Sequence, residues 1–80
     1  MDKIQILSEI QSIMRDVLDD ESIVLNEGTT ANDVDGWDSL TYIQWIVAIE
    51  KRFKIKFSSK EIFSWNKVGD MLEGISLKSN

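Results

Sequence analysis

The sequence contains no cysteine and no histidine. This absence excludes disulfides, thiolate nucleophiles, imidazole bases and the usual zinc ligands, so any thiol chemistry must come from another molecule. No imidazole is available to take a proton from a serine, and so small a fold offers little to exclude water from a Ser-Lys or carboxylate pair. We therefore expect that the chain is not an enzyme.

Long apolar runs are also missing. No stretch approaches the 18 residues of a membrane span, and the N-terminus lacks the basic segment and apolar core of a secretory signal. These features predict a cytoplasmic protein without a membrane partner. Proline is absent too, but this does not argue against loops.

The charge is acidic overall, with a formal net value of -5, and it is unevenly placed. Residues 1–38 carry ten acids against Lys3 and Arg15, whereas residues 39–80 carry four acids against seven bases. Such a balance disfavours nucleic acid and favours basic protein patches as partners. Simple solubility explains most of these acids equally well.

Eighty residues predict one domain, here 1–80, with room for one small core. Apolar residues recur at helical spacing in four segments, which predicts an all-α fold. The predicted helices cover residues 3–18, 39–54, 59–64 and 67–76. Capping residues expected at their starts are Asp2, Asp38, Ser58 (in a capping box with Glu61) and Asn66. Three apolar side chains are expected to anchor the short helix to the core: Ile62, Phe63 and Trp65.

A long loop over residues 19–38 separates the first two helices. A connection of this length is unusual unless it is functional or packed by its own side chains, and Ile23, Leu25 and Val34 are expected to hold it to the core. The acids of its second half could bind a hard cation, but they lack the glycine and closing glutamate of a calcium loop. A metal-binding domain is therefore the weakest alternative, and no metal site is expected in the isolated domain.

The helix after Ser39 carries two apolar stripes, although a surface helix needs only one. The wider stripe predicts the core face, and the spare stripe predicts a surface for another element or another protein. The core-facing residues are expected to be Tyr42, Trp45, Ile46, Ile49 and Phe53. The spare stripe consists of Leu40, Ile43 and Val47.

The segment Gly36-Trp37-Asp38-Ser39-Leu40, followed by Ile43, Val47-Ala48-Ile49-Glu50 and Phe53, resembles the signature of acyl carrier proteins. Asp-Ser-Leu alone is a weak motif, but here the resemblance extends over nearly the whole chain. It implies a small four-helix bundle of the acyl-carrier type with a short third helix.

The resemblance implies that Ser39 receives 4'-phosphopantetheine from coenzyme A through a phosphopantetheinyl transferase. It further implies that Asp38 supports this modification by helping to hold magnesium when the transferase is docked. Acyl or aminoacyl groups are then carried as thioesters between a loading ligase and downstream pathway enzymes. The expected carrier is a monomer that binds each partner modestly. The expected partner-binding residues are Leu40, Ile43, Gln44, Val47, Glu50 and Lys51.

The second helix departs from the housekeeping fatty-acid pattern. In that group its polar positions are rich in acids, whereas here they are Thr41, Gln44, Lys51 and Arg52, and only Glu50 is acidic. Trp37 also replaces a usually small residue. This favours a carrier for a specialised pathway, such as one that makes a polysaccharide, polyketide or peptide. The alternatives are a housekeeping fatty-acid carrier and an unmodified helical adaptor that uses the spare stripe.

Overall fold

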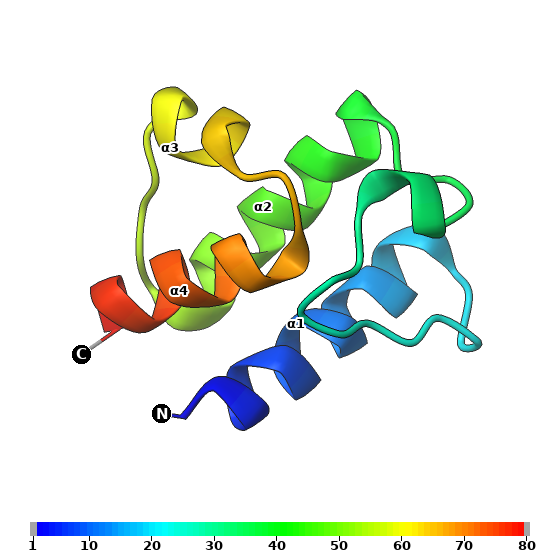
Figure 1. Cartoon of the computed structure of the whole chain (residues 1–80), viewed down its shortest axis with the longest axis horizontal. Helices are drawn as coiled ribbons and strands as arrows, with labels where there is room; N and C mark the ends of the chain where they lie inside the picture. Colours follow the sequence, from blue (N-terminus) through cyan, green and yellow to red (C-terminus); the bar gives the residue numbers. More distant parts are fainter. Residues whose placement is uncertain (1, 80) are drawn as a thin grey trace.

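The computed structural model describes residues 2–79, which form helices and loops without a β-strand. The three long helices are α1 (Lys3–Leu18), α2 (Ser39–Phe53) and α4 (Val68–Ser79). The 3-10 turn η1 (Ala31–Asp33) and the short helix α3 (Ser59–Ser64) lie between them. In Figure 1, α1 passes below α2 and α4, α3 lies above them, and the α1–α2 loop covers the right-hand end. The predicted all-α class is confirmed.

Acidic residues cap helix α1 at both ends. The Asp2 carboxylate accepts a hydrogen bond from the Gln5 amide at 2.8 Å, which is the predicted N-cap. Asp19 ends the helix in the left-handed conformation (φ 51°), and its amide donates to the carbonyls of the last turn. The helix therefore ends where the acidic run begins.

The core is built around one tryptophan of α2. Trp45 is fully buried, and its indole N–H donates to the Ile10 carbonyl of α1 at 2.9 Å. This bond satisfies the polar atom of a large apolar side chain inside the core. The other fully enclosed side chains come from α1, α2 and α4: Ile6, Ile10, Met14, Ile49, Val68, Met71, Leu72 and Ile75.

The loop over residues 19–38 is held by both side chains and backbone. Ile23 and Leu25 are buried and Val34 packs against the core, as predicted. Two polar side chains of α1 also hold it: Gln11 accepts from the Leu25 amide at 2.9 Å, and Arg15 donates to the Ile23 carbonyl at 2.8 Å. The loop is therefore packed rather than free, and one turn of it is helical, where the sequence predicts no helix.

The start of α4 differs from the prediction that Asn66 caps it. The amides of Val68 and Gly69 donate to the carbonyls of Thr29 and Glu27, at 2.9 and 2.8 Å. The backbone of the α1–α2 loop thus satisfies amides that a side-chain cap normally serves. A Cβ at position 69 would lie 3.0 Å from the Glu27 carbonyl oxygen, so glycine permits this close approach.

The helix ends also differ in small ways from expectation. Helix α2 ends at Phe53 because Lys54 adopts a left-handed conformation (φ 58°). Helix α4 continues to Ser79, although the polar end of the sequence predicts fraying after 76. Its last turn is held to α3 by the Lys78–Glu61 ion pair, with Nζ and Oε2 3.4 Å apart.

Helix α3 starts with the predicted capping box. Ser58 accepts from the Glu61 amide at 3.1 Å, and the Glu61 carboxylate accepts from the Ser58 amide at 2.9 Å. Ile62 is buried and Trp65 packs against the core, but Phe63 is 62% exposed and does not anchor the helix as predicted. It faces a surface cavity instead.

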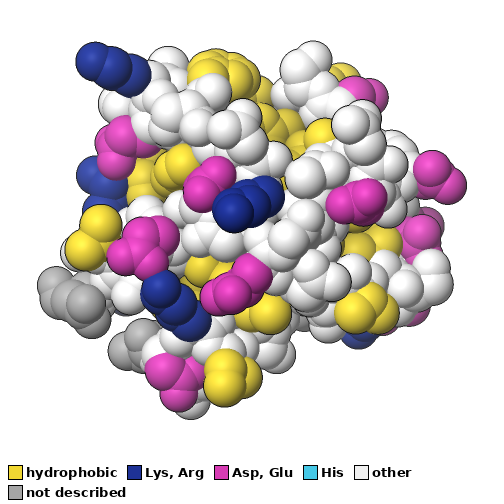
Figure 2. Space-filling model, viewed as in Figure 1, with side chains coloured by type: hydrophobic (Ala, Val, Ile, Leu, Met, Phe, Trp, Pro, Cys, Tyr) yellow, Lys and Arg dark blue, Asp and Glu magenta, His cyan; other side chains and the backbone are white. Residues whose placement is uncertain are grey.

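The charged surface follows the sequence asymmetry. On the face drawn in Figure 2, the charged side chains near the α1–α2 loop, at the right, are mostly acidic.

Within residues 2–79, no helix has the length and apolar character needed to cross a membrane.

Candidate functional site

A glycine turn positions the start of α2. Gly36 has a φ of +88°, a conformation that other residues adopt at a cost, and a Cβ here would lie 3.3 Å from a methyl carbon of Leu18. The turn is closed by hydrogen bonds from the Trp37 amide to the Val34 carbonyl and from the Asp38 amide to the Gly36 carbonyl. This turn therefore fixes the direction in which the chain enters α2.

Asp38 caps α2 together with Thr41. The Asp38 carboxylate accepts from the Thr41 amide at 2.9 Å, and the Thr41 hydroxyl accepts from the Asp38 amide at 2.8 Å. The same hydroxyl lies 2.6 Å from the Gly36 carbonyl, to which it can donate. The hydrogen bonds from the Thr41 amide and hydroxyl lower the pKa of Asp38 from its ordinary value of 3.8. Asp38 is therefore a fixed carboxylate at neutral pH.

Ser39 is the first residue of α2 and is exposed to solvent. Among residues 2–79, no partner forms a hydrogen bond with its hydroxyl group. The positive end of the helix dipole lies at this position and favours a negatively charged substituent. A hydroxyl here is accessible to an enzyme and suited to carry a phosphate ester.

The two stripes of α2 face opposite environments, as the sequence predicts. Trp45, Ile46 and Ile49 are buried, and Tyr42 and Phe53 pack partly against the core. The spare stripe is open: Leu40 is 68% exposed and Val47 42% exposed, and Ile43 lies between them. Gln44 and Lys51 are exposed on the same side of α2. Leu40, Ile43 and Val47 thus form an accessible apolar surface that begins next to Ser39, with the two polar side chains beside it.

Glu50 occupies a different position from the other predicted partner-binding residues. Its side chain is half-buried, and its carboxylate accepts a hydrogen bond from the Phe57 amide at 2.8 Å. It therefore helps to hold the connector between α2 and α3. The exposed charges around the C-terminal end of α2 are basic, because Lys51, Lys54 and Lys56 all lie on the surface there.

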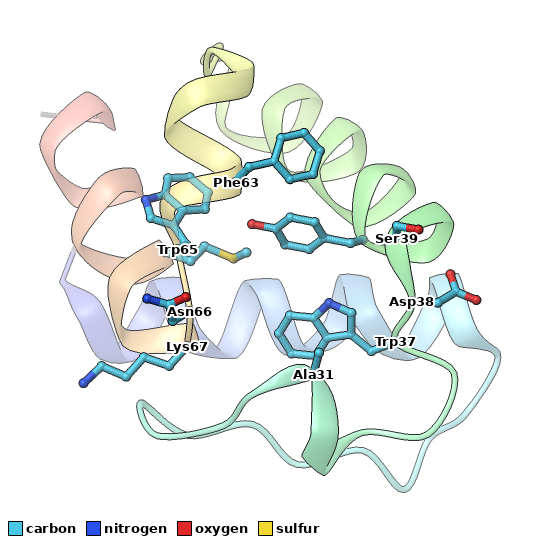
Figure 3. Close-up of a pocket in the computed structure, with 10 residues that line it drawn as sticks. Ala31, Trp37, Asp38, Ser39, Phe63, Trp65, Asn66 and Lys67 are labelled. Atoms are coloured by element: carbon cyan, nitrogen blue, oxygen red, sulfur yellow. The ribbon is translucent and has the colours of Figure 1, made fainter.

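A cavity of about 300 Å³ opens beside Ser39. Figure 3 shows the Trp37 ring approaching it from the α1–α2 loop, with Phe63 and Trp65 on the opposite side. Tyr42 forms another wall, and its hydroxyl donates to the Ile62 carbonyl of α3. Burial raises the pKa of Tyr42 to about 12, so the phenol stays protonated and keeps this bond at neutral pH.

The acids of the loop do not form a metal site by geometry. Within the part of the chain that the structure describes, no three acidic side chains come together in a way that could hold a metal ion. Asp33 instead caps η1, where its carboxylate accepts from the Thr30 amide at 2.9 Å. The Asp33 carboxylate thus serves local backbone structure.

The roles of two residues of the site are not predicted from the sequence. Thr41 closes the turn ahead of Ser39, and an Asp-x-x-Thr spacing at a helix start is the signal that could have indicated it. No comparable sequence signal indicates the exposure of Phe63. It lies next to apolar residues in a short helix, and the spacing does not show which face of that helix packs against the core.

Comparison with known families and structures agrees with this site. The family described as "Phosphopantetheine attachment site" matches residues 8–75. A solution structure of the holo acyl carrier protein from Geobacter metallireducens is 43% identical and superposes with a TM-score of 0.83. The match covers 90% of this chain and 83% of the Geobacter chain. No curated protein matches the sequence.

The match over most of the chain defines the class of protein: a helical carrier domain with a phosphopantetheine attachment site. This chain belongs to that family and is an acyl carrier protein. Its cofactor is covalently attached 4'-phosphopantetheine, and its function is to carry acyl groups. Proteins of this class serve as carriers rather than catalysts, and they interact with phosphopantetheinyl transferases and biosynthetic enzymes.

Proposed function

We propose that Ser39 is the attachment point and that the chain, as a single carrier domain over residues 1–80, serves a specialised biosynthetic pathway. The observation that carries this proposal is the free, exposed Ser39 hydroxyl at the start of α2, directly beside an exposed apolar stripe. When bound, the 4'-phosphopantetheine group supplies a thiol on a flexible arm, on which acyl or aminoacyl cargo is held as a thioester.

Attachment uses the Ser39 oxygen as the nucleophile. This oxygen attacks the pantetheine-side phosphorus of the coenzyme A diphosphate and loses its proton, which passes to a base of the transferase. The bond between that phosphorus and the bridging oxygen breaks, and adenosine 3',5'-bisphosphate leaves. The chain's own contribution is to present the hydroxyl at the positive end of α2, where the charge of the new phosphodiester is stabilised.

Asp38 is the residue proposed to support this reaction. Its Oδ1 atom accepts the hydrogen bond from the Thr41 amide, and its side chain is exposed beside Ser39. An exposed, ionised carboxylate is the oxygen ligand that magnesium prefers, so Asp38 can help to hold the ion that accompanies coenzyme A in the transferase complex. The lowered pKa of Asp38 keeps this ligand charged.

Partner enzymes are proposed to recognise α2 through Leu40, Ile43 and Val47, with Gln44 and Lys51 beside the stripe. Transient contact suits a carrier that must leave each enzyme, because rapid exchange requires fast dissociation. Glu50 is proposed as a polar flank, although the Phe57 amide already occupies its carboxylate. The expected partners are a transferase, an acyl- or aminoacyl-loading ligase and later pathway enzymes, each meeting a monomeric carrier in the cytoplasm.

The charges of α2 support a specialised pathway. A housekeeping fatty-acid carrier is expected to present acids along this helix to basic enzyme patches. Here the one acid is half-buried and hydrogen-bonded, and the exposed charge near its C-terminal end is basic. Partners of this carrier therefore need a surface that accepts Lys51 and its basic neighbours.

Intact-mass measurement tests the attachment point. The purified protein is incubated with coenzyme A, magnesium and a broad-specificity phosphopantetheinyl transferase, and the mass is expected to rise by one phosphopantetheinyl group. Ser39→Ala should abolish the gain while the far-ultraviolet circular dichroism stays unchanged. Ser59→Ala is the matched control, because Ser59 is also an exposed serine at the first position of a helix, and it should leave the gain intact. An unmodified Ser59→Ala protein, or a modified Ser39→Ala protein, contradicts the assignment.

A further inference from the structure

The hydroxyl of Thr41 connects two parts of the turn ahead of Ser39. It accepts a hydrogen bond from the Asp38 amide at 2.8 Å and lies 2.6 Å from the Gly36 carbonyl, to which it can donate. We propose that Thr41 is a positioning residue for the attachment reaction, because it holds Asp38 and, through it, Ser39 in the geometry that the transferase meets. This role rests on the proposed attachment at Ser39 and extends it to a residue that acts through its neighbours.

The Asp38 carboxylate is oriented by two contacts with Thr41. Its Oδ1 atom accepts a hydrogen bond from the Thr41 amide at 2.9 Å and lies 3.1 Å from the Thr41 hydroxyl. Both contacts use the same oxygen, so they fix the rotation of the carboxylate without occupying its second oxygen. A fixed orientation matters beside a reacting hydroxyl, because a misplacement of about 1 Å can slow a reaction by about a hundredfold.

The backbone that carries Ser39 is held by the same hydroxyl. Asp38 and Ser39 follow one another at the start of α2 (Figure 3). The Asp38 amide donates to both the Thr41 hydroxyl and the Gly36 carbonyl, at 2.8 and 3.1 Å. The Asp38 carbonyl accepts from the Tyr42 amide at 2.9 Å, which is the first backbone bond of α2. Asp38 is therefore held on both its amide and its carbonyl side, and its carbonyl group forms the peptide bond to Ser39.

The Thr41 hydroxyl contributes more to this geometry than to stability. Its hydrogen bonds lie at the exposed start of the helix, where water can replace a lost partner. Without the hydroxyl, Asp38 still keeps its bonds to the Thr41 amide and the Gly36 carbonyl. Loss of the hydroxyl should therefore loosen the turn without unfolding α2. An effect on modification is then separable from an effect on stability.

Three variants isolate the hydroxyl. Thr41→Val removes it and keeps the branched shape and the amide bond to Asp38, whereas Thr41→Ser keeps the hydroxyl. The matched control is Thr30→Val, because Thr30 is also half-buried at a helix start and its hydroxyl lies 3.3 Å from a carboxylate oxygen of Asp33. Urea unfolding followed by tryptophan fluorescence verifies that each variant is folded.

Single-turnover modification measures the positioning role. The broad-specificity transferase is used in excess over the unmodified full chain with coenzyme A and magnesium, and intact mass follows the gain with time. Varying the transferase concentration separates the plateau rate of the bound complex from the concentration that gives half of it.

The variants should differ in the plateau rate alone. Thr41→Val should lower it by about tenfold or more and leave the half-saturating concentration unchanged, because docking is intact and the Ser39 hydroxyl is misplaced. Thr41→Ser and Thr30→Val should keep both values within about twofold of wild type.

Hydrogen exchange of the unmodified carrier gives a second readout that needs no transferase. In ¹H–¹⁵N spectra, the Asp38 amide of Thr41→Val should exchange with water several-fold faster than in wild type, since it loses the shorter of its two hydrogen bonds. The Trp45 indole, which is bonded inside the core, should stay protected in every variant.

Three results overturn the role of Thr41. The first is a Thr41→Val plateau rate within about twofold of wild type, and the second is a lowered rate that Thr41→Ser shares. The third is a lowered Thr41→Val rate with unchanged exchange at Asp38, which excludes action through the turn. A wild-type chain that gains no mass instead refutes the proposed attachment at Ser39, so the two failures are distinguishable.

Discussion

The opposite environments of Ile49 and Val47 make a direct test of the assignment of the two faces of α2. Ile49 is fully buried, whereas Val47, two positions earlier, is 42% exposed on the spare stripe. Truncating a buried isoleucine to alanine costs about 2–5 kcal/mol, and an exposed substitution usually changes stability by less than about 0.5 kcal/mol. A domain of 80 residues is expected to have roughly 4–12 kcal/mol in total.

The assay is urea unfolding followed by tryptophan fluorescence and circular dichroism. With an m-value of about 1 kcal/mol/M, Ile49→Ala should lower the midpoint by about 2 M or more, while Val47→Ala should leave it nearly unchanged. The rate of modification by a transferase should respond in the other order, since Val47→Ala removes part of the proposed docking surface. If Val47→Ala destabilises the protein as much as Ile49→Ala, the assignment of the two faces is wrong. Phe53, another predicted core residue, is only partly buried and gives a weaker test.

Three further predictions concern the turn and the cavity. Asp38→Ala should slow modification by the transferase more than its loss of stability explains. Because the pKa of Asp38 is lowered, the stability that its carboxylate contributes is full above pH 3.8 and is lost as the pH falls through the pKa of the folded protein. The stabilities of the wild type and the variant should therefore converge in acid unfolding. The phenol of Tyr42, the single tyrosine, should titrate near pH 12 when followed by phenolate absorbance, and the stability of the protein should fall as the pH rises above 10. A phenol that titrates at pH 10 in the folded protein contradicts the burial of Tyr42. Gly36→Ala should cost about 1–2 kcal/mol and slow modification, measured by urea unfolding and by mass; an unchanged midpoint refutes the strained turn.

Much of the architecture can be predicted from the sequence because it depends on local signals. Helical spacing identifies the long helices and the buried face of α2, and the Ser58–Glu61 capping box is a four-residue pattern. The exposed serine after a capping aspartate is likewise local. These features are written in neighbouring residues, so no knowledge of the tertiary fold is needed to find them.

The contacts that hold the site depend on residues far apart in the sequence. The Val68 amide bonds to the Thr29 carbonyl, and Gln11 holds the Leu25 amide, but neither pairing has a local signature. The sequence alone therefore predicts that Asn66 caps α4 and indicates no role for Gln11 in holding the loop. It also places Phe63 among the anchors, because an apolar residue in a short helix does not show which face is covered.

The cavity beside Ser39 is the largest part of the site that could not be predicted. Its walls come from residues before α2, within α2 and around α3, and it exists because these segments converge. The aromatic residues are visible in the sequence, yet only the fold shows that Trp37 and Phe63 face the same space (Figure 3).

The phosphopantetheine arm is proposed to be attached to Ser39, one of nine serines in the chain. Fragmentation mass spectrometry of the protein co-expressed with a broad-specificity phosphopantetheinyl transferase locates the group directly. Attachment at Ser39 predicts a single phosphopantetheinyl group on the fragment that contains this residue, with every other serine unmodified. A group found on Ser58, Ser59 or any other residue, or a protein that stays unmodified under conditions that load a known carrier, contradicts it.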